Sequence, residues 1–125
     1  MATTDELALT AHLMRRAGFG ATTSELEALA KKPYEDVVED ILHPERFPDI
    51  EEDIAERYFG IRFGSKNQWI YRMVNTQRPL EEKIALFWHG VFATGEVKLN
   101  NIGSLENQVG MLRRSGMVRL DDLLI

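Results

Sequence analysis

The fold is organised around the sequence PLEEKIALFWHGVFAT, residues 79–94. Its proline suits the first turn of a helix, where the missing N–H is not needed. Glu81 and Glu82 follow where the positive end of the helix dipole favours negative charge. From Ile84 to Phe92 the residues are apolar on most sides of a helical wheel, which is typical of a largely buried helix. We therefore expect a central helix over about residues 79–93.

Helical patterns continue on both sides of this stretch. The sequences TTDE at residues 3–6 and TTSE at residues 22–25 are capping boxes, which predict helices that run to about Ala17 and Ala30. Further helices are expected over about residues 33–42, 49–59, 69–74 and 104–115, with a short amphipathic one in VRLDDLLI at the end. Residues 95–103 are expected to form a loop. The chain is therefore predicted to be all-α, an irregular bundle of about six to eight short helices in one domain spanning residues 1–125.

Composition narrows the class of protein. The chain has 125 residues, 44% hydrophobic and 28% charged, which fits one small globular domain. Its net charge of −5 argues against a general nucleic-acid partner, because such proteins need a basic face. There is no cysteine and no apolar run long enough for a membrane span, and the acidic residues near the start lead us to expect no export signal. We therefore expect a cytoplasmic protein with no membrane partner and no cofactor.

The sequence RRAGFGAT, which begins at Arg15, lies between the first two predicted helices. We prefer to interpret it as a corner: Gly18 ends the first helix in a left-handed conformation, Phe19 fills the core and Gly20 lets the chain turn. The alternative is an anion site, in which Arg15, Arg16 and the amides of Gly18 and Gly20 hold a phosphate. The signal for that site is weak, because the longer G-x-G-x-x-G pattern and a preceding strand are both missing.

His89 is the one candidate for catalysis. It lies at the edge of the apolar arc of the central helix, with Glu82 two turns earlier on the same side. Its imidazole could act as a general base, but no nucleophile is near it in sequence, so a structural role is preferred. The other histidines, His12 and His43, are too far away in sequence for a metal-ligand pattern, and no metal site is predicted.

The aromatic residues form a set at helical spacings, for which core packing is the default and a ligand pocket the alternative. Its members are Trp69, Tyr71, Phe87, Trp88 and Phe92.

Two motifs carry a family resemblance. AHLMRRAGFGATTSELEAL, from Ala11, and RPLEEKIALFWHGVFATGEVK, from Arg78, resemble the opening signatures of the domain-of-unknown-function 1800 family. The resemblance implies a largely helical bacterial protein without an established activity, longer than this chain, of which residues 1–125 would be the N-terminal portion. Many relatives carry Trp-His-x-His in the second motif; Trp88 and His89 match it, and Val91 stands in place of the second histidine.

Two functions follow from these features. The preferred one is a non-catalytic packing and interaction module that uses exposed apolar surface to contact a partner, another copy of the chain or the missing C-terminal region. The abrupt ending motivates it, because Leu120, Leu123 and Leu124 need something to cover them. The alternative is the N-terminal fragment of a hydrolase-like or anion-handling enzyme, with the two corner arginines and His89 converging in one cleft.

Overall fold

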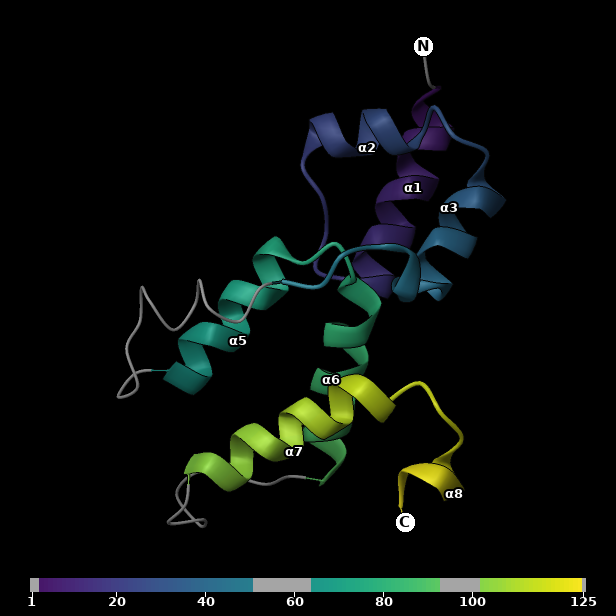
Figure 1. Cartoon of the computed structure of the whole chain (residues 1–125). Helices are drawn as coiled ribbons and strands as arrows, with labels where there is room; N and C mark the ends of the chain where they lie inside the picture. The colour runs from purple at the N-terminus through teal and green to yellow at the C-terminus, as the bar shows by residue number, and fades with distance from the viewer. Residues whose placement is uncertain (1–2, 51–63, 93–101, 125) are drawn as a thin grey trace.

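The computed structural model of the chain describes residues 3–50, 64–92 and 102–124 (Figure 1). These ranges contain seven α-helices, one 3-10 turn and no strand. The all-α prediction is therefore confirmed. The elements are α1 (Thr4–Ala17), α2 (Thr23–Leu29), α3 (Tyr34–Leu42), η1 (Pro44–Arg46), α5 (Gly64–Asn75), α6 (Pro79–Phe92), α7 (Ile102–Ser115) and α8 (Leu120–Leu123). The helix expected over residues 49–59 and the loop expected over residues 95–103 lie almost entirely outside the described residues.

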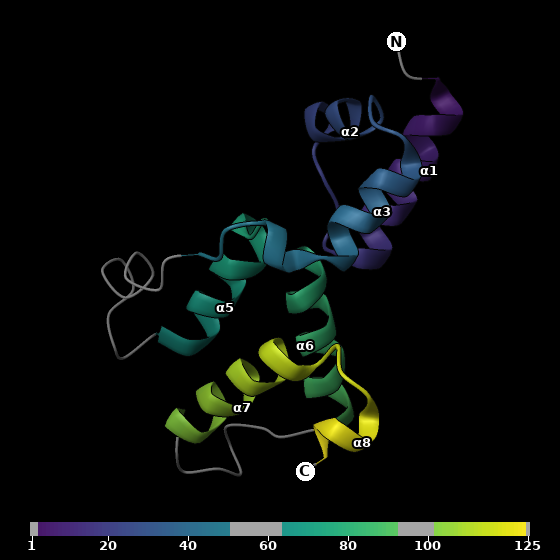
Figure 2. The ribbon, with the colours of Figure 1, turned by 45° about the vertical axis from the view of Figure 1, so that its right-hand side comes forward.

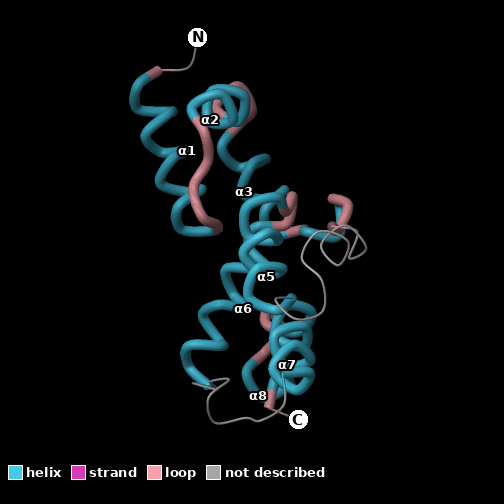
Figure 3. Tube along the Cα trace, turned by 90° about the vertical axis from the view of Figure 1, so that its left-hand side faces the viewer, coloured by secondary structure: helices cyan, strands magenta, loops and turns pink. Residues whose placement is uncertain are grey.

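Helix α6 connects the two ends of the molecule. Figures 1, 2 and 3 show α1, α2 and α3 gathered at one end and α5, α7 and α8 at the other. Helix α6 contacts α1 and α3 at the first end of the molecule and α5 and α7 at the second. We call the place where the two ends meet the junction. The predicted central position of this helix is therefore confirmed. Within the described residues, no helix has the length and apolar character needed to cross a membrane.

The expectation that α6 is largely buried was wrong. Only Glu82 and Ala85 are buried on this helix, whereas Phe87 and Val91 are 57% and 55% exposed. Helices α5 and α7 cover the side that carries Ala85, whereas Leu86, Phe87 and Val91 in the second half of the helix are exposed. A helix whose sequence is apolar all round is therefore only partly covered.

The core at the α6–α8 end forms where three helices meet. Ala85, Leu112 and Leu123 are buried against one another, one from each of α6, α7 and α8. Three rings of the predicted aromatic set, Trp69, Trp88 and Phe92, pack onto this cluster and are half-buried. Phe87, a further member, is exposed, so the core-packing prediction holds for only part of the set.

The last helix docks through one leucine. Leu123 is buried against the core, and Leu120 and Leu124 are 53% and 63% exposed. Leu120 and Leu124 are left largely exposed within the described residues, so the expectation that a partner, another copy or further chain covers them stays a prediction.

Local sequence accounts for the first two helices. Thr3 Oγ1 accepts a hydrogen bond from the N–H of Glu6 at 3.2 Å, and the Glu6 carboxylate accepts one from the N–H of Thr3 at 2.7 Å. Thr22 and Glu25 make the same reciprocal pair ahead of α2. Both predicted capping boxes are confirmed, and each satisfies N–H groups that the first turn of a helix leaves open.

Gly116 allows the segment after α7 to approach α6 closely. A Cβ built on Gly116 would lie 2.3 Å from the carbonyl oxygen of Leu112 and 2.8 Å from Cγ2 of Ile84. The carbonyl oxygen of Gly116 accepts a hydrogen bond from Trp88 Nε1 at 2.8 Å. This bond satisfies the polar atom of a tryptophan that packs on the core.

We expect Gly116→Ala to lower the free energy of unfolding by about 1–3 kcal/mol, since the added methyl must displace packed atoms. The control is Gly90→Ala, in α6, where an added Cβ meets no atom within 4 Å. That change should raise stability by about 0.5–1 kcal/mol, because alanine favours the helix over glycine. Urea unfolding of both variants measures the difference. Equal effects of the two substitutions would contradict the close packing at Gly116.

Candidate functional site

The corner between α1 and α2 contains a left-handed glycine, but it is not the glycine that the sequence predicts. Gly18, the residue after α1, has φ −157° and ψ −144°, an extended backbone rather than the expected left-handed one. The positive φ, 98°, belongs to Gly20. Gly18 is instead required by space, because a Cβ there would lie 2.8 Å from Cβ of Pro79. The corner therefore packs the end of α1 directly against the start of α6.

Phe19 does not fill the core, as the sequence had suggested. Its ring is 41% exposed, and Nζ of Lys83 lies 5.1 Å from the ring centroid. Its neighbour Gly18 explains this position, because Gly18 takes the buried place against Pro79 and Phe19 is exposed. Lys83 Nζ also donates to the carbonyl oxygen of Arg15 at 3.5 Å, which adds a second link between α1 and α6.

The candidate anion residues lie together at this corner. Arg15 and Arg16 are exposed in the last turn of α1, where they complement the negative end of the helix dipole. The N–H of Gly20 donates to the carbonyl oxygen of Met14 at 3.2 Å, and Gly18 is buried. The anion site stays a prediction. Of its two glycine N–H groups, that of Gly20 already donates to a carbonyl of the protein.

His89 lies on the face of α6 that meets α5. Its ring makes an edge-to-face contact with Trp69, with the centroids 5.3 Å apart and the planes at 86°. Its Nδ1 is buried and has no hydrogen-bond partner within the described part of the chain. No hydrogen bond or ion pair in that part joins His89 to Arg15 or Arg16. The catalytic role of His89 stays a prediction.

Glu82 is the polar group that sequence reasoning missed. Its side chain is 1% exposed, and its carboxylate accepts three hydrogen bonds from side chains on α5 and α7. The donors are Trp69 Nε1 at 2.9 Å, Arg72 Nε at 3.0 Å and Arg113 Nε at 2.5 Å. Nη2 of Arg72 continues the network to Asp49 Oδ1 at 2.6 Å. We call the set of Trp69, Arg72, Glu82 and Arg113 the Glu82 cluster.

The charges around the cluster compensate the burial of Arg72. Burial alone would lower the pKa of the Arg72 guanidinium, but the hydrogen bond and charge of Glu82, with a smaller effect of Asp49, raise it. The adjacent Glu81 behaves differently. Burial raises the pKa of its carboxyl, and Arg78, with Nη1 at 3.9 Å from Oε2, offsets part of that rise. The two neighbouring glutamates therefore differ: Glu82 is held by cations, and Glu81 is disfavoured as an anion.

A signal for the cluster was present in the sequence. Glu82, Ala85, His89 and Phe92 recur at i, i+3, i+7 and i+10, which places them on one face of a helix. A carboxylate on the apolar face needs a cation, because an unpaired buried charge is very costly. That rule would have predicted an arginine partner for Glu82, although not which arginine.

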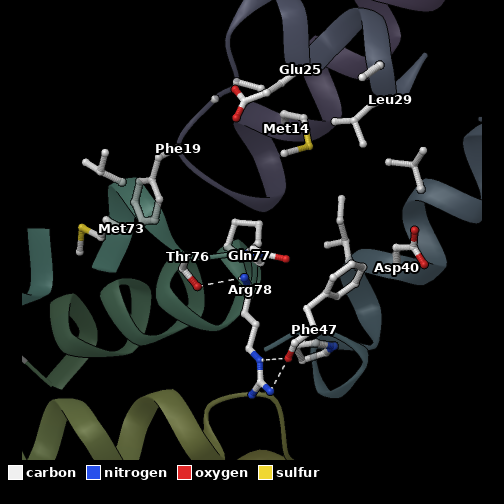
Figure 4. Close-up of a pocket in the computed structure, with 18 of the residues that line it drawn as sticks. Met14, Phe19, Glu25, Leu29, Asp40, Phe47, Met73, Thr76, Gln77 and Arg78 are labelled. Carbon is white, nitrogen blue, oxygen red and sulfur yellow. Dashed lines mark hydrogen bonds between the residues drawn. The ribbon is translucent and has the colours of Figure 1, made fainter. Parts of the chain in front are cut away.

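A pocket lies at the junction of the two ends of the molecule (Figure 4). It has a volume of about 420 Å³. Residues of α1, α2, α3 and η1 line it on one side, and the segment from Met73 to Pro79 lines it on the other. Nε and Nη2 of Arg78 donate to the carbonyl oxygen of Phe47 at 2.8 and 2.5 Å, which closes one edge. The described residues contain no group of three or more side chains suited to a metal ion.

We expect Glu82→Gln to lower the free energy of unfolding by about 3–5 kcal/mol at pH 7, because it leaves two arginines without their buried counter-charge. Guanidinium-induced unfolding followed by tryptophan fluorescence measures the loss. A change below about 1 kcal/mol, the range of surface pairs, would contradict the burial of this carboxylate.

Glu81→Gln is the matched control, and it should act in the opposite direction. Because the folded-state pKa of Glu81 is raised above its ordinary value of 4.5, ionisation of Glu81 destabilises the fold. The variant should therefore match the parent well below pH 4.5 and become more stable than it as pH rises through 4.5 and the raised pKa. Thermal melts across pH 3.5 to 7 test this. A gain that is largest at low pH would refute the sign.

Comparison with known proteins gives one match. The chain matches a family model described as "Protein of unknown function (DUF1800)" over residues 12–125. The matched range includes nearly all of the first motif and the whole of the second. Searches of curated proteins and of solved structures gave no significant match. Because the family model covers most of the sequence, the chain belongs to the DUF1800 family of proteins of unknown function.

Proposed function

We propose that this chain is a non-catalytic helical module that packs, through an exposed apolar surface, against a second copy of itself. The surface carries the proposal. Its residues come from the second half of α6 and from the C-terminal segment. They are Phe87, Val91, Met117, Val118, Leu120 and Leu124, each at least 43% exposed. We call this set the α6–α8 surface.

The two parts of the α6–α8 surface border each other. Gly116 lies against Ile84 and Trp88 of α6. Met117 and Val118 are the next two residues of the chain, so they begin at that contact. Phe87 is three residues after Ile84 and Val91 is three after Trp88. Residues at this spacing are neighbours on a helix, so Phe87 and Val91 flank the place where the C-terminal segment touches α6.

The pattern on α6 suits another helix as occupant. Leu80, Ile84, Phe87 and Val91 recur at spacings of four, three and four residues. This is the apolar repeat by which two helices pack side chains into each other's gaps. Leu80 and Ile84 are half-buried within the chain, and Phe87 and Val91 extend the stripe into solvent. Large exposed apolar patches on soluble proteins commonly mark interaction sites.

The position of His89 supports the non-catalytic part of the proposal. A histidine that acts as a base is usually oriented by a hydrogen bond to its second ring nitrogen. His89 Nδ1 makes none within the described ranges, and its ring instead packs edge-on against Trp69. We therefore assign His89 a packing role, and we place the module in the cytoplasm as part of the same proposal. The alternative, a fragment of a hydrolase-like or anion-handling enzyme, remains a second prediction.

Light scattering across a range of protein concentrations tests the proposal. We expect the mass of the parent chain to rise above 14.3 kDa with concentration. Val91→Glu should return it to the monomer mass, because a carboxylate would be buried without a partner. Leu9→Glu, at a 47% exposed leucine on α1, is the control and should leave association unchanged.

A parent chain that stays monomeric at every concentration would contradict a second copy as the occupant. If such a monomer binds an apolar dye that Val91→Glu removes, the occupant is instead another segment or partner. An equal loss of association in Val91→Glu and Leu9→Glu would remove the α6–α8 surface from the account.

A further inference from the structure

The pocket at the junction has the size and walls of a small-molecule site. Its volume of about 420 Å³ falls within the range of roughly 300–1,000 Å³ found for such sites. Most of the half-buried or buried residues that form its walls are apolar, the exceptions being Asp40, Thr76 and Arg78. The apolar ones include Met14, Leu29, Val37, Ile41, Phe47 and Met73. Ligand sites commonly lie where two structural units meet, as this one does.

Every charged residue of the lining already has a hydrogen-bond partner within the described part of the protein. These residues are Glu25, Lys32, Asp40 and Arg78, two acids and two bases. Glu25 accepts from Thr22, Lys32 Nζ donates to Asp40 at 3.1 Å, and Arg78 donates to the carbonyl of Phe47. A ligand carboxylate would therefore lose its water without gaining a free cation, and a ligand cation would have to compete with Lys32 for Asp40.

Gln77 supplies an uncommitted polar side chain in the lining. Its side chain is exposed at the rim, and its amide makes no hydrogen bond within the described ranges. An amide can both donate and accept, so it suits a hydroxyl or carbonyl group on a ligand.

We propose that this pocket binds an uncharged, mainly apolar molecule that carries a single hydroxyl or carbonyl group, with that group at the Gln77 amide. The site is separate from the α6–α8 surface, and it does not depend on self-association. It adds a binding activity that the packing role does not supply.

The test uses two probes that share one apolar chain, octan-1-ol and octanoate. The sequence contains five methionines, of which Met14 and Met73 line the pocket. Met111 and Met117 lie elsewhere, and Met117 reports on the α6–α8 surface. In a chain with carbon-13-labelled methionine methyls, octan-1-ol should shift the Met14 and Met73 signals saturably. Octanoate should bind at least roughly tenfold more weakly, because its carboxylate finds no free cation.

Two substitutions of an alanine by tryptophan test whether octan-1-ol binds in the pocket. Ala28 lines the pocket and is exposed on α2, so Ala28→Trp should fill the space and abolish the octan-1-ol shifts. Ala8, exposed on α1 outside the lining, is the control, and Ala8→Trp should leave the shifts unchanged.

Three results would overturn the proposal. Shifts of Met111 and Met117 as large as those of Met14 and Met73 would show non-specific binding only. Equal affinity for octanoate and octan-1-ol would refute the uncharged class of ligand. Unchanged octan-1-ol binding in Ala28→Trp would place the ligand outside the pocket.

Discussion

The carboxylate of Glu82 is the interaction on which the α5–α8 end of the molecule depends. It is 1% exposed, and it receives hydrogen bonds from Trp69 and Arg72 of α5 and from Arg113 of α7. The apolar core beside it is small, so apolar packing alone leaves the helices several ways to fit. Replacing a buried ion pair by apolar residues often costs little, but a charge that has lost its partners is expensive. The Glu82 cluster therefore mainly selects one arrangement of the helices. In that arrangement Arg72 and Arg113 both reach the Glu82 carboxylate.

The two ends of the molecule meet through contacts of a different kind. Gly18 packs on Pro79, Lys83 donates to the carbonyl of Arg15, and Arg78 donates to the carbonyl of Phe47. These contacts are few and lie at the margins of the junction, which leaves the pocket between them. Helix α6 thus has two structural roles. It joins the ends, and its far face supplies the apolar stripe of the α6–α8 surface.

The sequence predicted the parts of the fold that local chemistry determines. Both capping boxes, the end of α1 at Ala17 and the extent of α6 follow from neighbours within one helical turn. The errors concern tertiary contacts. Gly18 was assigned a left-handed backbone because a glycine ending a helix usually has one, whereas its close approach to Pro79 is visible only in the fold. The burial of Glu82 was missed because a first-turn glutamate is ordinarily solvated, and its partners lie 10 and 31 residues away. The pocket could not be predicted at all, because its walls come from segments distant in sequence.

The exchange of the Trp69 indole proton with solvent reports on whether the Glu82 carboxylate holds α5 against α6. The chain has two tryptophans, and both indole N–H groups donate within the structure, Trp69 to Glu82 and Trp88 to Gly116. Nitrogen-15 NMR after transfer to heavy water distinguishes the two protons. We predict that the Trp69 indole proton is protected and exchanges only when the fold opens, because its acceptor is a buried carboxylate. Exchange of that proton at the rate of an unfolded chain, in a protein that remains folded, would show that Glu82 does not hold α5 against α6.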